Sequence, residues 1–222
     1  MWREIPLVLG KDLRIEVRSR VLVNQVAPFT LLVIVLFGFA LDADTTTLRS
    51  FSAGLFWVAV LLSALLAIQR AFAIESADGA TAGLRLSGLS PSAIFLGKAA
   101  AIAVQLLVLE LLLSAGIVVF YDAEIEAPLL FAAAAAAATL GIAAAGTLYG
   151  VLAAGLRVRE TILPILLLPV LAPVLIAATR AFDDALGSAA VNGWAWTGLL
   201  VVFAVTYIVF GTLAYGVLLE ET

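Results

Sequence analysis

Six long apolar segments, separated by stretches that hold most of the charges, constrain this chain more than any other feature. They lie at about 21–41, 51–69, 93–121, 127–154, 161–179 and 194–219. Each has the roughly 20 residues that an α-helix needs to cross a hydrocarbon core of about 30 Å. Backbone groups in lipid must be hydrogen-bonded within the protein, so the segments are expected to be helices. The predicted fold class is an all-α integral membrane protein with six transmembrane helices, and residues 1–222 form one membrane domain.

The composition removes several function classes. The 222 residues are 64% hydrophobic and 13% charged, whereas about a quarter of the residues in a globular domain are charged. Cysteine and histidine are both missing, so neither thiolate nor imidazole chemistry is available. The chain also lacks the P-loop pattern G-x-x-x-x-G-K-[ST], so it cannot bind ATP by a P-loop. We expect a non-catalytic membrane protein with no nucleic-acid partner, while a mechanism that uses carboxylates alone stays open.

Residues 1–20 have the pattern of an amphipathic helix, interrupted by a proline and a glycine. One side of the predicted helix is apolar and the opposite side is charged: Trp2, Ile5, Leu9 and Leu13 against Glu4, Lys11 and Arg18. A tryptophan on the apolar side together with basic residues is typical of a helix that lies in the membrane interface. The alternative is a frayed tail whose periodicity is accidental.

The distribution of charge predicts the orientation in the membrane. If the N-terminus is cytoplasmic, the inner segments hold ten of the twelve basic residues: Arg3, Lys11, Arg14, Arg18, Arg20, Arg70, Arg85, Lys98, Arg157 and Arg159. The outer loops then hold only Arg49 and Arg180, together with seven of the sixteen acidic residues. Because basic residues concentrate in cytoplasmic loops, we expect both termini in the cytoplasm and the lipid bilayer of the inner (cell) membrane around the helices.

One ionisable side chain lies in the middle of a predicted span. Glu110 is in the third segment, and Gln105 lies five residues before it. A charged carboxylate at that depth costs about 2.5 kcal/mol or more, so it is expected to face a partner, a cavity or another helix. Two interpretations stay open, a structural hydrogen bond between helices and a residue of a transport pathway. The two side chains are about 140° apart on a helical wheel, so they need not share a face.

The fourth and fifth segments differ in how their helices are expected to pack. The fourth has an alanine tract at 132–138 and then Gly146-x-x-x-Gly150, a spacing that lets two helices approach closely. The fifth contains Pro164, Pro169 and Pro173, each of which removes a backbone donor. We expect this helix to be kinked or broken, either as a bent packing helix or as a hinge that moves during transport.

The interval 70–98 is the longest polar stretch between two apolar segments. It is either a solvated connector or the place where a partner docks. Glycines in it permit a tight turn, two acids can charge the start of a short helix, and two leucines offer apolar contacts. The candidate docking residues for a separate ATPase are Glu75, Asp78, Gly79, Gly83, Leu84, Arg85, Leu86 and Ser87.

Two stretches of the chain carry recognisable patterns. The first stretch carries Trp57, Ala59, Ser63, Leu65, Leu66, Ala67, Arg70, Phe72, Glu75, Asp78, Gly79, Leu84, Leu86, Ser90, Pro91 and Lys98. The second is the Leu-Pro…Pro-x-x-x-Pro pattern at 163–173 with the apolar residues after it. With the length and the six-segment plan, these patterns resemble the CcmB family, the permease B proteins of heme export in cytochrome c maturation. The sequence departs from the family pattern at Ala80, Thr81 and Ala82, directly after the Asp-Gly pair.

The resemblance implies a permease subunit of an ATP-binding-cassette complex. In that family two permease copies pair with two copies of a separate, CcmA-like ATPase, and other membrane subunits of cytochrome c maturation join them. Heme is the ligand that is moved or released, and ATP is bound by the partner. No cofactor is expected on this chain, because without histidine or cysteine and with Met1 as its one methionine it offers no common axial ligand to heme iron.

Three other functions stay open at this point. A related permease for a drug or a polysaccharide would share the six helices and the docking loop. A stand-alone ion-coupled transporter would use Glu110 and would need no ATPase. A membrane scaffold that transports nothing would depend on neither.

Overall fold

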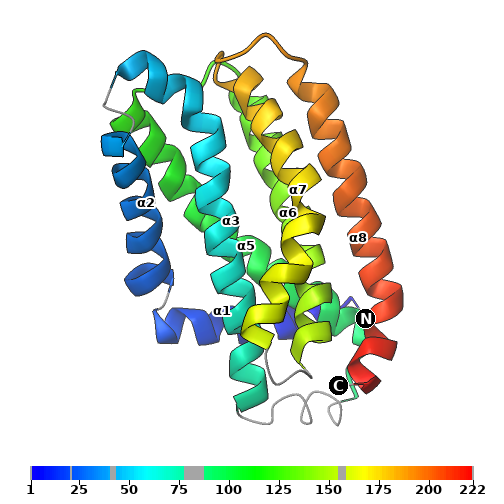
Figure 1. Ribbon diagram of the computed structural model, residues 1–222. Helices are drawn as coiled ribbons and strands as arrows, with labels where there is room; N and C mark the ends of the chain where they lie inside the picture. Colours follow the sequence, from blue (N-terminus) through cyan, green and yellow to red (C-terminus); the bar gives the residue numbers. More distant parts are fainter. Residues whose placement is uncertain (1, 21, 41–43, 78–87, 155–158, 222) are drawn as a thin grey trace.

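The computed structural model describes residues 2–20, 22–40, 44–77, 88–154 and 159–221, and every regular element in these ranges is a helix (Figure 1). A short π-helix, η1, precedes α2 without a break. The elements in chain order are α1 (Ile5–Ser19), η1 (Leu22–Val26), α2 (Ala27–Ala40), α3 (Thr45–Ala77), α5 (Pro91–Tyr121), α6 (Pro128–Ala154), α7 (Arg159–Ala185) and α8 (Gly193–Glu221). The predicted all-α class is confirmed.

Within the described residues five helices, α3, α5, α6, α7 and α8, are long and apolar enough to cross a membrane. A sixth span is obtained if the bent pair Ile5–Ser19 and Asn24–Ala40, which meet at 52°, is counted as one. The predicted 21–41 segment thus corresponds to a π-turn followed by a 14-residue α2. The second and fifth predicted segments extend further than expected, because α3 has 33 residues and α7 has 27. In Figure 1 α1 lies across one end of the bundle, which is called the base below.

The ends of the helices follow from local chemistry. The residue before α5 is Ser90, in an extended conformation, and Pro91 occupies the first turn, where its missing N–H costs nothing. α5 ends at Asp122, whose φ of 53° is left-handed, and α1 ends in the same way at Arg20 with φ 52°. A single left-handed residue terminates a helix because it cannot continue the right-handed path.

Small residues bring α6 close to its neighbours, and α6 contacts α3, α5, α7 and α8. A Cβ atom built on Gly146 would lie 2.2 Å from the Ile68 side chain, and one on Gly150 would lie 2.2 Å from the Phe72 ring. Both neighbours belong to α3. The predicted close approach at Gly146-x-x-x-Gly150 is therefore confirmed, and α3 is the helix that uses it.

Two polar contacts attach α2 to the bundle. The Thr30 and Ser63 hydroxyls lie 2.8 Å apart between α2 and α3. The Tyr121 hydroxyl donates to the Ile34 carbonyl at 2.6 Å, which joins the end of α5 to α2. Hydroxyls that bridge helices in this way supply attraction that apolar surface cannot, since lipid tails are as apolar as the side chains.

Of the two predicted alternatives for the fifth helix, kinked or broken, the break is wrong, because α7 runs as one helix through Pro164, Pro169 and Pro173. The kink stays a prediction. Pro169 and Pro173 are exposed, while the buried side of α7 is made of aliphatic residues such as Leu167 and Leu171. Proline is tolerated within membrane helices when local adjustments and neighbours satisfy the freed carbonyls. The role of these prolines as a hinge stays a prediction.

Candidate functional site

The base of the bundle brings together charged residues of three helices that are far apart in the sequence. α1 packs across α5 there, and α3 ends beside it (Figure 1). Four positions spaced by four residues, Glu4, Val8, Asp12 and Glu16, contact the bundle. Because residues i and i+4 lie on the same face of a helix, they form one stripe along α1.

Glu4 binds the start of α5. Its Oε2 atom accepts a hydrogen bond from the Ser90 hydroxyl at 2.6 Å and another from the Ser90 backbone N–H at 2.9 Å. These two bonds, with a smaller contribution from the chain N-terminus, lower the pKa of Glu4 from 4.5 to about 2. A carboxylate at a helix N-terminus is also favoured by the helix dipole. Glu4 therefore fixes the beginning of α1 against the first turn of α5.

Val8 provides the apolar contact of the stripe. It is 2% exposed, and a Cβ atom built on Gly97 would lie 2.5 Å from the Val8 Cβ. Only glycine leaves room for α1 at this distance. Gly97 is therefore the position at which the two helices cross most closely.

Asp12 and Glu16 face two basic residues of the bundle. Lys98 of α5 is 1% exposed. Its Nζ atom lies 3.7 Å from the Asp12 carboxylate and 4.9 Å from the centre of the Phe72 ring. Arg70 of α3 has its Nε 3.9 Å from Glu16. Lysine is almost never fully buried unless it is paired, and both the acid and the ring favour its charge. α1 thus contributes the acids that allow a cation at Lys98 to be buried.

Three of these contacts fix α1 on α5, and the fourth, between Glu16 and Arg70, reaches α3. The four contacts together are called the clasp below. α3 and α5 flank the predicted docking segment, of which Glu75 lies in the last turn of α3. The other predicted docking residues, Asp78, Gly79, Gly83, Leu84, Arg85, Leu86 and Ser87, lie outside the described residues. Sequence reasoning missed the clasp, although the spacing of Glu4, Asp12 and Glu16 was a signal for it.

The outward side of α1 agrees with an interfacial helix, but it differs in detail from the predicted apolar face. Trp2 is 78% exposed, as expected, together with the apolar Leu7 and Val17 and the basic Arg3, Arg14 and Arg18. Ile5, Leu9 and Leu13 are instead half-buried. The helix rotates toward its acidic stripe because ion pairs at the base attract it.

Gln105 and Glu110 do not form a common site. Gln105 lies under α1, in a small depression that it shares with Asp12, Glu16 and Arg70. Glu110 is 3% exposed and faces α6, where the Thr139 hydroxyl donates to its Oε1. Its Oε2 is buried and has no hydrogen-bond partner within the described residues. The structure thus provides the helix-to-helix hydrogen bond that was one of the two interpretations, and a pathway role stays a prediction.

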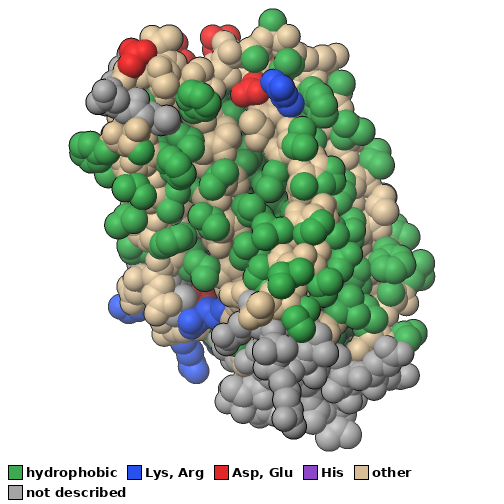
Figure 2. Space-filling model, in the orientation of Figure 1, with side chains coloured by type: hydrophobic (Ala, Val, Ile, Leu, Met, Phe, Trp, Pro, Cys, Tyr) green, Lys and Arg blue, Asp and Glu red, His purple; other side chains and the backbone are tan. Residues whose placement is uncertain are grey.

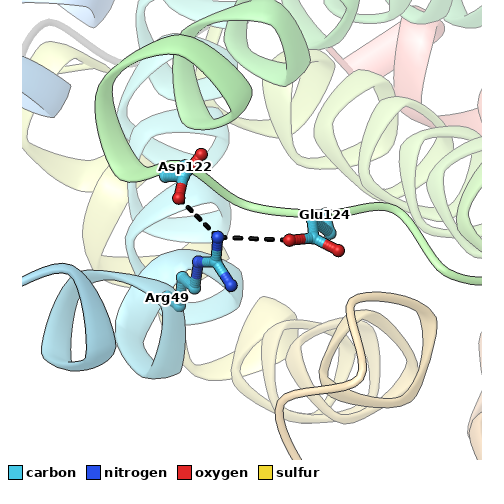
Figure 3. Close-up of polar contacts among 3 residues, drawn as sticks. All are labelled: Arg49, Asp122 and Glu124. Carbon is cyan, nitrogen blue, oxygen red and sulfur yellow. Dashed lines mark hydrogen bonds and ion pairs between the residues drawn. The ribbon is translucent and has the colours of Figure 1, made fainter.

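The opposite end of the bundle is acidic. Arg49 at the start of α3 pairs with Asp122 and, at 3.2 Å, with Glu124, which lie between α5 and α6 (Figure 3). On the face drawn in Figure 2 the acidic side chains gather mainly at this end and the basic ones mainly at the base. The predicted segregation of charge between the two ends is therefore present in the described part of the chain.

Long apolar helices, hydroxyl bridges between them and charges gathered at the two ends define a multi-pass α-helical membrane protein. Within the described ranges no three His, Cys, Asp or Glu side chains are grouped so that they could hold a metal ion. The family described as CcmB protein matches residues 3–221, so the chain belongs to the CcmB family.

Characterised relatives share the match over most of their length. Heme exporter protein B of Escherichia coli K12 is 30% identical over 216 residues, 96% of each chain. Heme exporter protein B of Haemophilus influenzae is 28% identical over 178 residues, 80% of each chain. The protein of the same name from Rhodobacter capsulatus is 28% identical over 170 residues, which cover 76% of this chain and 78% of the relative.

Proposed function

We propose that this chain is the permease subunit of an ATP-driven complex that exports or releases heme for c-type cytochrome maturation. Its CcmB membership and relatives that carry the name heme exporter protein B support the cargo. The sequence has no P-loop, so ATP hydrolysis belongs to a separate, CcmA-like ATPase. A second copy of the chain and further membrane subunits of cytochrome c maturation complete the proposed assembly.

The observation that carries the coupling role is the clasp of α1 across α3 and α5. The segment proposed to receive the ATPase connects these two helices. A displacement of that segment would pass to both helices, and α1 would keep them from moving independently. Rigid elements joined by packing and ion pairs are the means by which proteins transmit a displacement over such distances.

Heme enters this proposal as cargo. Its iron would be ligated by a partner, because the chain has neither histidine nor cysteine and its one methionine is Met1. The apolar interior and the polar base of this subunit would then serve conformational change rather than iron binding. Heme added to the purified chain should accordingly show no axial ligation by the protein in its absorption spectrum.

The orientation proposed for the complex places the base of the bundle and both termini in the cytoplasm. The ten basic residues assigned to the inner side support it, against two on the outer side. Because the chain has no native cysteine, single cysteines report position cleanly. A cysteine at Thr46 should react with a membrane-impermeant thiol reagent in whole cells, and one at Ala80 should react only after lysis. The reverse pattern would overturn the orientation.

Docking of the ATPase is tested by affinity purification in mild detergent. Gly79→Val and Asp78→Lys should leave the amount of permease in the membrane unchanged and lower the ratio of recovered ATPase to permease. Gly198→Val is the matched control. Gly198 is an exposed glycine of α8, and nothing lies within 4 Å of a Cβ atom built on it. The yield of holocytochrome c should fall with the ratio. Full ATPase recovery with both docking variants would place the docking site elsewhere, and loss of recovery in the control as well would mean that the assay reports instability.

A further inference from the structure

A cleft of 760 Å³ lies beside α3, between the start of α2, the end of α6 and the start of α7. Its volume is within the range of about 300–1,000 Å³ that ligand sites have. Pro164, one of the three prolines of α7, is part of its wall. The cleft is separate from the clasp contacts of α1 except at Arg70, which belongs to both.

Most of the lining of the cleft is apolar, and its polar side chains are few. The polar lining residues are Gln25, Gln69 and Arg70, and on the base side of Arg70 the wall includes the apolar Phe72 and Ala73. Phe29, Leu62 and Leu65, about one to two helical turns further from the base, are apolar. Arg70 is the only charged residue among the described lining residues. A ligand that matches this wall has one anionic group at the base end and an apolar body directed toward the middle of the membrane.

Beyond Arg70 the cleft covers most of one leaflet of a bilayer. From Arg70 to Leu62 its lining on α3 spans eight residues, which at 1.5 Å per residue is about 12 Å. Half of a hydrocarbon core of about 30 Å is about 15 Å. A lipid whose phosphate lies on Arg70 would therefore have most of the leaflet depth of its acyl chain along the cleft.

Arg70 has hydrogen-bonding capacity for an anion. Its Nε atom is buried and makes no hydrogen bond to the described residues, and its ion pair with Glu16 spans 3.9 Å. Arginine binds phosphate through several N–H groups held in one plane. Because this Nε is buried, a phosphate would bind the outer N–H groups of the guanidinium, and the Arg70 side chain as a whole is 32% exposed.

We propose that this cleft is a binding site for an anionic phospholipid, with the phosphate on Arg70 and an acyl chain against Leu62 and Leu65. The position of Arg70 at the base, where the basic side chains gather, puts the headgroup at the level of the membrane surface. The proposal is independent of heme export. A second copy of the chain and heme itself are the rival occupants.

The test uses native mass spectrometry of the full chain purified in mild detergent, titrated with dioleoyl phosphatidylglycerol or dioleoyl phosphatidylcholine. Both lipids have the same acyl chains, so the difference in retention reports the charge. We expect the wild type to retain phosphatidylglycerol about fivefold better, the factor that corresponds to about 1 kcal/mol per basic residue near an anionic lipid. Arg70→Gln should remove this preference, whereas Arg14→Gln, an exposed arginine on α1, should keep it.

A large side chain placed in the cleft distinguishes lipid bound at this site from lipid bound non-specifically to the protein surface. Leu66 lines the cleft and is 43% exposed, and Val58 on the same helix is 41% exposed but lies outside the cleft lining. Leu66→Trp should lower retention of both lipids several-fold, and Val58→Trp should leave it unchanged.

Equal retention of the two lipids by the wild type, or a charge preference that survives Arg70→Gln, would overturn the proposal. Displacement of phosphatidylglycerol by hemin at equal concentration would overturn it too and would make heme the occupant. Lipid that is bound to monomers but missing from dimers would overturn it and would make a second copy of the chain the occupant.

Discussion

α6 and α8 have nearly the same length and almost equal mean hydropathy, yet they have opposite surroundings. Within their most apolar windows, 67% of α6 is buried inside the protein and only 22% of α8 is. Alanines and glycines fill α6, while large residues such as Leu199, Val202 and Leu213 face outward from α8. Hydropathy shows that a segment leaves water, and side-chain size decides whether its neighbours are protein or lipid.

Gly146→Leu should have the largest effect, because it attacks the helix that depends on small residues. Even a Cβ at this position would lie 2.2 Å from the Ile68 side chain. Overpacking typically costs about 1–3 kcal/mol, and four added carbons between α6 and α3 put this variant at about 3 kcal/mol or more. The measurement is the free energy of unfolding in a dodecyl sulfate titration. Gly198→Leu in α8, where nothing lies within 4 Å, should change it by about 0.5 kcal/mol or less.

Gly211→Leu tests whether all of α8 tolerates larger side chains or only the side of α8 that faces outward. Gly211 is in α8, but a Cβ there would lie 2.0 Å from the Phe95 ring of α5. We expect a loss of about 2 kcal/mol, less than at Gly146 because α8 has a lipid-facing side toward which it can shift. A cost equal to that of Gly198→Leu would show that α8 contributes no tight contact at all.

Substitutions at Glu110 of α5 test its polar contact with Thr139 of α6, a contact whose surroundings are otherwise apolar. Glu110→Leu removes the acceptor of the Thr139 hydroxyl, which should cost about 1 kcal/mol, whereas Glu110→Gln keeps an acceptor and should cost less. A double-mutant cycle with Thr139→Val isolates the pair, and a coupling energy near zero would contradict it. Normal holocytochrome c yield with a stable Glu110→Leu variant would exclude a pathway role.

The smallest effect is expected at α1, a helix held by polar contacts instead of close packing. The pKa of Glu4 is about 2 in the docked state and 4.5 without its partners, so its contribution to docking is complete above pH 4.5 and is lost as the pH falls toward 2. Glu4→Gln should therefore release α1 partly at pH 7, and the difference from the wild type should disappear toward pH 2. The two proteins share every other ionisable group, so the comparison isolates Glu4.

Docking of α1 can be followed by the distance between nitroxide labels on cysteines at Gly10 and Val104, both exposed. The wild-type distance distribution should be narrow at pH 7 and broaden in acid. Equal distributions for wild type and Glu4→Gln at pH 7 would contradict the role of Glu4.

The membrane-spanning helices could be predicted because apolar length is a local property. All five helices from α3 to α8 lie where the apolar segments are, and the approach at Gly146 was visible in its spacing with Gly150. The clasp could not be predicted in the same way, because Glu4 lies 86 positions before its partner Ser90. Acid and base spacing in α1 shows which residues share a face but not which distant helix supplies the opposite charge.

The helix in which local reasoning failed is α7. Its prolines predicted a kinked or broken helix, since in water each one costs about 3 kcal/mol or more within a helix. The break is wrong, and Pro169 and Pro173 are on the exposed side, where their rings do not disturb the buried aliphatic side. The orientation of a helix relative to its neighbours thus decides the effect of proline, and the sequence alone does not contain it.

The clasp also implies an order of events during synthesis and membrane insertion of the chain. α1 leaves the ribosome before α3 and α5, and Ser90 follows Glu4 by 86 residues, or about 4–17 s at 5–20 residues per second. During that interval the contact between Glu4 and Ser90 has not formed, and α1 can rest on the membrane surface through its exposed apolar and basic residues. α1 can then dock at the base only after α3 and α5 have both been inserted. A docked α1 therefore indicates that the helices from α1 to α5 have assembled.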